Sequence, residues 1–361
     1  MRAPWGSVLV TPNVLGKDGV SALSRELVRA LPAPVLVLSL HDASMSAASP
    51  IGAPIRGARG RQASFLAHIG RTMIQCGADT VVVCSHLHLA PAAVILAWQG
   101  PRPTLLLCGI EAWVPLRHRE RRALAASDLV SISQHTVDRF RAANPRLASH
   151  DVAVCHPGLP ANPAAVPPSR LSSSALIVSR MSAAERYKGH DVLLEIWPRV
   201  RERHPDATLV VAGDGDDRSR LEEKARSLGL VGAVKFVGRL NDEELTRLYD
   251  ECRMFVMPSR DEGFGLVFLE AMRAAKPCIG GTGAAAEIIV DGVTGAVIDS
   301  DNRDALLAAV DRLYADPEAA IRLGAAGRER FLSDFTDRHF QMRFRTLIAR
   351  RTRAALAPSL R

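Results

Sequence analysis

Short runs of apolar residues alternate with amphipathic stretches along most of the chain, and this alternation limits the fold more than any other feature. The apolar runs of the first half are short enough to be buried strands. They cover residues 8–10, 34–40, 80–85, 104–108 and 129–133. Stretches with helical spacing, such as 21–31 and 62–76, separate them. This alternation is typical of a doubly wound α/β protein with parallel sheets.

A proline-rich stretch at residues 157–169 interrupts the pattern and predicts an interdomain linker. The alternation then restarts. Further apolar runs stand at residues 175–179, 208–213, 234–238 and 254–259. With 361 residues the chain is long enough for two domains. We therefore expect α/β domains at 1–165 and 166–335, followed by a helical segment at 336–361.

Two local expectations concern helices of the second half. Residues 191–200 carry one apolar stripe with helical spacing, and Pro198 within it should kink or shorten that helix. After the run at 208–213, Asp216 or Asp217 is expected to cap the next helix.

The composition, with 47% hydrophobic and 23% charged residues, is that of a globular protein. None of the six cysteines stands in a C-x-x-C pair, which favours buried free thiols in a reducing compartment. The N-terminus reads as a first strand rather than a signal peptide. No window has about 18 consecutive apolar residues. We therefore expect a cytoplasmic protein.

The net charge of +8 is uneven, because residues 1–165 hold 16 Lys and Arg against 9 Asp and Glu. A basic half suits nucleic acid, an anionic membrane face or a phosphorylated substrate, although charge alone slightly favours a merely solvated surface. Nucleic acid is disfavoured for two reasons. Only 5% of the residues are aromatic, and no aromatic residue stands among the clustered arginines at 56–61 and 117–122 to stack on a base. Peripheral association with the inner face of the membrane follows as an expectation.

The segment from Met257 to Pro277, M-P-S-R-D-E-G-F-G-L-V-F-L-E-A-M-R-A-A-K-P, contains the most informative motif. A buried strand ends at Met257, two glycines flank a phenylalanine, and a helix begins near Leu266. Glycines at such a junction let a ligand approach the backbone, and the helix start suits a phosphate or sugar oxygen. Glu262 and Glu270, eight positions apart, can reach one ligand from different elements.

This segment resembles the E-x7-E signature of the retaining glycosyltransferases of family 4. The family's Arg…Lys-Gly motif, its glycine-aspartate turn and its closing G-A-A-A-E-I-I-V-D-G segment also occur in order over residues 175–300. The first half matches more loosely, through K-D-G-V-S-A-L-S-R-E-L, C-G-I-E-A-W and H-P-G. The resemblance implies a GT-B fold, in which two Rossmann-like doubly wound domains face a central cleft. It also implies that the segment 336–361 packs back toward the N-terminal domain.

By this resemblance, Arg180 and Lys188 hold the donor diphosphate, and Glu262 binds hydroxyls of the transferred sugar. Two fixed cations can neutralise the leaving phosphates without a metal, whereas the residue types alone more often indicate surface charges. Glu270 accepts from the ribose. Backbone groups bind the remaining parts of the donor. They are those of Gly263, Phe264, Gly265, Leu266, Arg239 and Leu240.

In the first domain, Gly16, Asp18 and Gly19 form a loop after the first strand that faces the diphosphate or the acceptor. The further acceptor candidates follow later strands. They are His86, His88, Cys108 and Glu111. A packed or solvent-facing histidine is an equally good interpretation of His86 and His88. Cys108 stands where many family members carry a histidine, and Lys276 lacks the glycine that commonly precedes it.

These observations predict a retaining, metal-independent hexosyltransferase that uses a UDP- or GDP-linked sugar and a glycan or lipid-linked acceptor of cell-surface polysaccharide synthesis. No cofactor is expected, since Asp214, Asp216 and Asp217 are explained more simply by a turn and a cap than as metal ligands. The alternatives are a nucleotide-sugar epimerase or hydrolase on the same fold, or a non-catalytic nucleotide-sugar-binding subunit. The sequence leaves the oligomeric state open.

Overall fold

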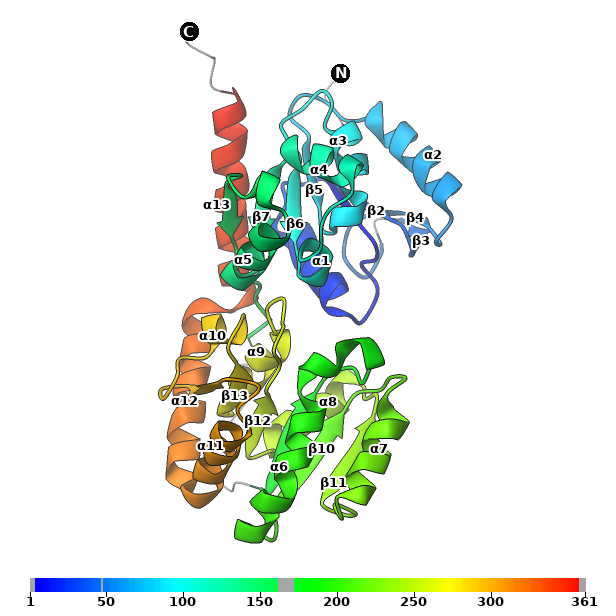
Figure 1. The fold of residues 1–361 in the computed structure, drawn as a ribbon. Coiled ribbons are helices and arrows are strands. Elements are labelled where there is room, and N and C mark those ends of the chain that lie inside the picture. The colour runs from blue at the N-terminus through cyan, green and yellow to red at the C-terminus, as the bar shows by residue number, and fades with distance from the viewer. Residues whose placement is uncertain (1–3, 47, 162–171, 357–361) are drawn as a thin grey trace. The chain divides into compact units, whose positions relative to one another are not determined.

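The computed structural model describes residues 4–46, 48–161 and 172–356, with side chains to Arg351, and it divides into two compact units. The first unit comprises Met1–Pro157 and Asp337–Arg361, and the second is Gly158–Thr336. Each is a parallel-sheet α/β domain, shown in Figure 1. Most of the expected linker, from residue 162 onward, lies outside the described residues.

The N-terminal domain is built on a sheet with the strand order β3-β4-β2-β1-β5-β6-β7-β8. Its strands are β1 (Ser7–Thr11), β2 (Val35–Ser39), β3 (Ala43–Met45), β4 (Ile55–Ala58), β5 (Val81–Cys84), β6 (Thr104–Leu107), β7 (Asp128–Ser131) and β8 (Val152–Val154). Only β3 pairs antiparallel. Every residue of β1, β2, β5 and β6 is buried, which explains why these strands are continuous apolar runs.

Helices cover this sheet in two groups of neighbours. The helix α1 (Gly19–Ala30) contacts α13 (Asp337–Leu356), so the last helix of the chain completes the first domain. In the other group, α3 (Ala90–Leu96) contacts both α2 (Gln62–Met73) and α4 (His118–Ala125). A further helix, α5 (Gln134–Ala143), follows β7.

The C-terminal domain has a six-stranded parallel sheet with the order β11-β10-β9-β12-β13-β14. Its strands are β9 (Ser174–Val178), β10 (Thr208–Ala212), β11 (Val234–Gly238), β12 (Met254–Met257), β13 (Cys278–Gly281) and β14 (Gly295–Ile298). Its helices are α6 (His190–Arg203), α7 (Arg218–Ser227), α8 (Asp242–Glu251), α9 (Leu266–Arg273), α10 (Ala285–Ile288), α11 (Arg303–Ala315) and α12 (Pro317–Asp334). The predicted restart of the α/β pattern is thus confirmed.

Two local expectations about helices concern Pro198 and Asp217. The helix α6 runs through Pro198 to Arg203, so the proline does not shorten it. The expected side-chain cap of α7 was wrong. Asp217 stands at the start of α7, but its side chain makes no capping hydrogen bond there and binds arginines instead.

The end of α9 explains why the missing glycine before Lys276 matters. The N–H of Ala275 donates to Met272 O (2.9 Å) and that of Lys276 donates to Ala271 O (3.0 Å), which is a Schellman motif. The motif requires a left-handed residue, and Ala275 occupies that position with φ of 55°. Glycine is preferred there because an alanine Cβ is strained in this region.

We therefore predict that Ala275→Gly stabilises the protein. Relief of the left-handed strain, about 1–2 kcal/mol, exceeds the extra entropy of an unfolded glycine, about 0.5–1 kcal/mol. The melting temperature of the C-terminal domain should rise by roughly 1–3 °C in calorimetry. The matched control is Ala274→Gly, where φ is −85° and no strain is relieved, so the melting temperature should fall. A lower melting temperature for Ala275→Gly would contradict the argument.

Candidate functional site

Three loops of the C-terminal domain follow neighbouring parallel strands. Residues 179–189 follow β9, 213–217 follow β10, and 258–265 follow β12. Because β10, β9 and β12 are adjacent and parallel, their carboxyl ends lie at one edge of the sheet. Ligands of open α/β sheets bind at this edge. These loops carry Arg180, Lys188 and Glu262.

Lys188 and Glu262, 74 residues apart in sequence, form an ion pair in which Lys188 Nζ lies 2.5 Å from Glu262 Oε2. Both side chains are largely buried, with 14% and 17% of their surface exposed. Solvent therefore screens this pair less than it would a surface pair. Ser259 Oγ lies 3.5 Å from the same carboxylate oxygen.

The glycine after Lys188 allows this contact. Gly189 has φ of 91°, and a Cβ there would lie 2.7 Å from Pro258 Cγ and 2.8 Å from Pro258 O. The backbone N–H of Arg260 also donates to Tyr187 O (3.0 Å). The loop at 179–189 therefore packs directly on the loop that carries Glu262.

Arg180 is the more exposed of the two predicted cations, with 75% of its side chain exposed, and it pairs with Glu185. The glutamate is largely buried, and its Oε2 has no hydrogen-bond partner among the described residues. Sequence reasoning missed Glu185, which lies in the 3₁₀ segment Ala183–Lys188 between the two cations.

A second set of contacts binds this 3₁₀ segment to the glycine-aspartate turn at 213–217. The backbone of Met181 both donates to Asp214 O (3.1 Å) and accepts from the Asp217 N–H (2.9 Å). The Ala183 N–H donates to Asp216 Oδ1 (3.1 Å). Arg186 makes a two-pronged contact with Asp217, at 3.1 and 2.9 Å.

Asp217 lies at the centre of a chain of ion pairs. Arg220 donates to it as well as to Asp191 on α6, and Lys224 donates to Asp191 and Glu195. Hydrogen bonds from Arg220, then from Arg186, hold the pKa of Asp217 well below its usual range. The chain of charges fixes the 3₁₀ segment, and with it Lys188, to α6 and α7.

Glu270, the second glutamate of the E-x7-E pair, lies in the second turn of α9 and does not contact Lys188. Its Oε2 accepts from the hydroxyl of the buried Tyr249 on α8 (2.8 Å). Burial raises the pKa of Glu270, although the Tyr249 hydroxyl favours its charged form. Sequence reasoning missed Tyr249, because only the packing of α8 against α9 reveals it.

The remaining donor candidates lie near these groups along the backbone. Gly265 must be a glycine, since φ is 97° and a Cβ would lie 2.7 Å from Phe268 Cδ2. Phe264 is buried with its ring 6.1 Å from that of Phe335. Leu266 begins α9, and Gly263 lies just before the turn. Arg239 and Leu240 are farther away, because they follow β11, which β10 and β9 separate from β12.

In the N-terminal domain, the predicted loop at residues 16–19 is tightly constrained. Asp18 caps α1 by accepting from the Ser21 N–H (3.0 Å), and the Ser21 hydroxyl and Asn13 bind its other oxygen. Burial opposes the charge of Asp18, but these hydrogen bonds outweigh it and lower its pKa. A Cβ on Gly16 would lie 2.6 Å from Ser21 Oγ, and Gly19 is the first residue of α1. Asp18 thus has a structural role in this loop.

The other acceptor candidates meet where β5 and β6 end. His86 and His88 have ring centroids 5.1 Å apart, and His88 Nδ1 lies 3.0 Å from Glu120 Oε1 on α4. The Cys108 thiol donates to Ser85 O (3.3 Å), and its N–H donates to Glu111 Oε1 (2.7 Å). Burial, then Glu111 and Cys84, raise the pKa of Cys108, so the thiol stays neutral. Sequence reasoning missed Glu120.

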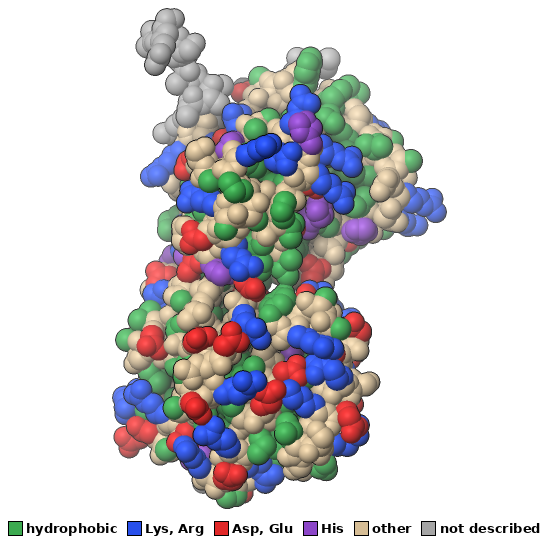
Figure 2. All heavy atoms as spheres, in the orientation of Figure 1, with side chains coloured by type: hydrophobic (Ala, Val, Ile, Leu, Met, Phe, Trp, Pro, Cys, Tyr) green, Lys and Arg blue, Asp and Glu red, His purple; other side chains and the backbone are tan. Residues whose placement is uncertain are grey.

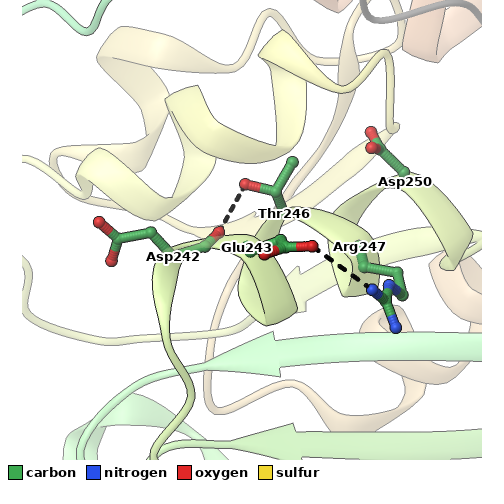
Figure 3. Close-up of a pocket in the computed structure, with 5 residues that line it drawn as sticks. All are labelled: Asp242, Glu243, Thr246, Arg247 and Asp250. Atoms are coloured by element: carbon green, nitrogen blue, oxygen red, sulfur yellow. Dashed lines mark hydrogen bonds and ion pairs between the residues drawn. The ribbon is translucent and has the colours of Figure 1, made fainter.

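No group of three or more His, Cys, Asp or Glu side chains within the described ranges is arranged to hold a metal ion. Nor does any helix of the described chain have the length and apolarity needed to cross a membrane. Figure 3 shows a shallow hollow on α8, lined by Asp242, Glu243, Thr246, Arg247 and Asp250. Its polar groups bind one another along the helix, as in the contact of Thr246 Oγ1 with Asp242 O (2.7 Å), and it contains none of the candidate residues.

Comparison with solved structures identifies the class of fold. The structure superposes on that of Anabaena HepE, determined in complex with UDP and glucose, with a TM-score of 0.78 at 17% identity, covering 95% of this chain and 99% of that one. For the sucrose-phosphate synthase of Thermosynechococcus elongatus the TM-score is 0.72 at 18% identity, covering 97% and 99%. The predicted GT-B fold of two Rossmann-like domains is confirmed.

At the level of sequence, residues 167–330 match the family model described as "Glycosyl transferases group 1". A GDP-mannose-dependent alpha-(1-6)-phosphatidylinositol monomannoside mannosyltransferase of Mycolicibacterium smegmatis is 35% identical over 178 residues, 47% of either chain. A glycogen synthase of Mycobacterium tuberculosis is 32% identical over 260 residues, 71% of this chain and 60% of that protein. The chain thus spans about half to three fifths of the length of these curated relatives.

The contacts of Asp217 generate a prediction about the loop that carries Lys188. Asp217→Asn removes the charge that binds Arg186 and Arg220, so the C-terminal domain should lose about 1–2 kcal/mol of unfolding free energy, given that both arginines are partly exposed. Amides of residues 182–189 should exchange hydrogen faster. Because the folded pKa lies below the unfolded one, the stabilisation is complete above about pH 4, and the difference should not change between pH 6 and 8.

The control for this variant is Glu223→Gln, which breaks an exposed pair with Arg226 on the same helix. It should cost less than about 0.5 kcal/mol and leave the exchange of residues 182–189 unchanged. Equal effects of the two substitutions on the exchange of this segment would show that Asp217 does not position it.

Proposed function

We propose that the protein transfers a hexose from a UDP- or GDP-linked donor to a hydroxyl of a glycan or lipid-linked acceptor in cell-surface polysaccharide synthesis, with retention of configuration. The observation that carries this proposal is the ion pair of Lys188 with Glu262 within a stretch that matches group 1 glycosyl transferases. A cation for phosphate and a carboxylate for sugar hydroxyls lie side by side, as a nucleotide-sugar requires.

The donor diphosphate would bind Arg180 and Lys188. Because 75% of the Arg180 side chain is exposed, its guanidinium can bind a phosphate from the solvent side while it stays beside Glu185. Lys188 would lie between the phosphate and Glu262. As the bond to the sugar breaks, charge develops on the leaving phosphate, and two preorganised cations stabilise it without a metal ion.

Glu262 would accept hydrogen bonds from hydroxyls of the transferred sugar, assisted by the backbone of Gly263, Phe264 and Gly265. Glu270, whose Oε2 is taken by Tyr249, would offer its other oxygen to the ribose. The backbone of Arg239 and Leu240 would meet the base. In a retaining transfer the acceptor attacks from the side that the nucleotide leaves, and the departing phosphate oxygen takes the acceptor proton. No general-base carboxylate is then required.

The acceptor would bind the basic N-terminal domain at the ends of β5 and β6, where His86, His88, Cys108 and Glu111 lie. The mannosyltransferase relative is named for a phosphatidylinositol acceptor and a GDP-mannose donor, whereas HepE was determined with UDP and glucose. These names support a nucleotide-sugar donor and a lipid or glycan acceptor, and they leave both nucleotides as candidates.

A panel of UDP- and GDP-linked sugars, incubated with and without membrane lipid extract in EDTA, tests the proposal. Release of free nucleotide that depends on the acceptor and persists in EDTA is the expected result. Release or isomerisation without acceptor would assign the protein to the epimerases or hydrolases, and binding without turnover would make it a non-catalytic subunit. Loss of activity in EDTA that Mg²⁺ or Mn²⁺ restores would overturn metal independence.

Substitution of the two cations tests their place in the site. Arg180→Ala or Lys188→Ala should each lower kcat/KM by about 10²- to 10³-fold, as expected for the loss of one preorganised charge. Arg199→Ala, which breaks an exposed pair with Asp304 elsewhere in the same domain, should leave the rate within about twofold. Wild-type rates for both Arg180→Ala and Lys188→Ala would remove these residues from the reaction.

A further inference from the structure

The helix α2 is apolar on its outer face as well as on its inner face. Phe65, Ile69 and Thr72 are buried toward the sheet. The opposite side of the helix, one continuous stripe at helical spacing, is exposed and contains no polar residue. It consists of Ala63, Leu66, Ala67, Gly70 and Ile74. A surface helix of a globular protein normally carries polar residues there, so this stripe indicates an apolar environment outside the domain.

The neighbouring helix α3 extends the apolar surface. Trp98, just after α3, is 73% exposed, and Ile95 is 47% exposed, alongside 65% for Leu66 and 80% for Ile74 on α2. The two helices contact each other. Exposed large side chains scattered singly are common, but a group of this kind on adjacent helices marks an interaction surface. A tryptophan in such a group is typical of the boundary between water and lipid.

The third helix of the same layer, α4, supplies positive charge. The exposed residues in and just before this helix include Arg117, His118, Arg119 and Arg122, and α4 contacts α3. No ion pair of these four side chains occurs among the described residues, whereas Arg121 is partly buried and donates to Leu116 O. Figure 2 shows basic side chains gathered over the position of α4 and hydrophobic ones along α2 on one visible face. Apolar and cationic groups thus share one helical layer.

We propose that the outer surface of α2, α3 and α4 docks the protein on an anionic lipid bilayer. The apolar stripe of α2 with Ile95 and Trp98 enters the interface, and the α4 cations bind lipid phosphates. Such a surface lies on the membrane and does not span it. Charge complementarity selects a lipid surface over a second copy of the chain, because two copies of this face would bring like charges together. This inference rests on the proposed function, because a protein docked on the bilayer can reach a lipid-linked acceptor.

Co-sedimentation of the 361-residue chain with vesicles tests the proposal. The protein should bind vesicles of phosphatidylglycerol and phosphatidylcholine, bind phosphatidylcholine alone weakly, and dissociate as salt is raised. The apolar variant, Leu66→Ser with Ile74→Ser and Trp98→Ser, and the charge variant, Arg117→Gln with Arg119→Gln and Arg122→Gln, should each weaken binding by about tenfold or more.

The matched control is Val231→Ser with Val293→Ser and Ile321→Ser, which removes exposed apolar residues from the other domain. It should bind vesicles as the wild type does. Trp98 is the most exposed of the tryptophans among the described residues, so vesicles should shift its fluorescence to the blue and brominated lipid should quench it. Trp98→Phe should abolish this shift while binding persists.

Unchanged vesicle binding in both variants would overturn the proposal. So would a wild-type protein that does not bind anionic vesicles. If light scattering shows a dimer that becomes a monomer in the apolar variant, while vesicle binding is unchanged, the surface would instead bind a second copy of the chain. Calorimetry with UDP and GDP separates this test from that of the proposed function. Intact nucleotide binding in the variants places the defect on the membrane side, whereas a wild type that binds vesicles but no nucleotide would refute only the proposed function.

Discussion

The ion pair of Lys188 with Glu262 is the interaction on which the candidate site depends. It joins the loops that follow β9 and β12, and it neutralises two charges in a poorly solvated place. Loss of either partner would leave the other largely buried and uncompensated. The pair also holds the lysine and the glutamate within reach of one ligand before any ligand arrives, so that binding costs little reorganisation.

This pair is in turn held by a larger set of charges. Arg186 and Asp217 fix the 3₁₀ segment to α7, and Arg220 and Lys224 extend the contacts to α6. Several half-exposed pairs that share partners restrict a loop more than isolated surface pairs do, because each side chain is already ordered by its neighbour. The loop that carries both predicted cations is thus rigid where it meets the sheet, while Arg180 extends into solvent.

Sequence reasoning predicted most of the strands because the buried ones are continuous apolar runs, but it did not predict β3, β4, β8, β13 and β14. It placed Glu262, Gly265 and Leu266 at one strand–helix turn. It predicted that a glycine is usual before Lys276. The structure explains this preference, because Ala275 has a left-handed backbone conformation there. It was wrong about Asp217, whose side chain accepts hydrogen bonds from Arg186 and Arg220 instead of capping the helix. The sequence analysis also failed to identify three residues of the candidate sites, because packing determines their partners. They are Glu185, Tyr249 and Glu120.

Cys108 lies at the ends of β5 and β6, at the position where the family resemblance would place a histidine. A neutral thiol that donates to Ser85 O offers no charged or bifunctional group to a ligand. Two imidazoles lie at this edge, those of His86 and His88, and His86 Nδ1 accepts from the His88 N–H. Burial lowers the pKa of His86, so the ring is neutral near pH 7 and carries its proton on Nε2. His86 therefore presents a hydrogen-bond donor at the edge where the cysteine presents none.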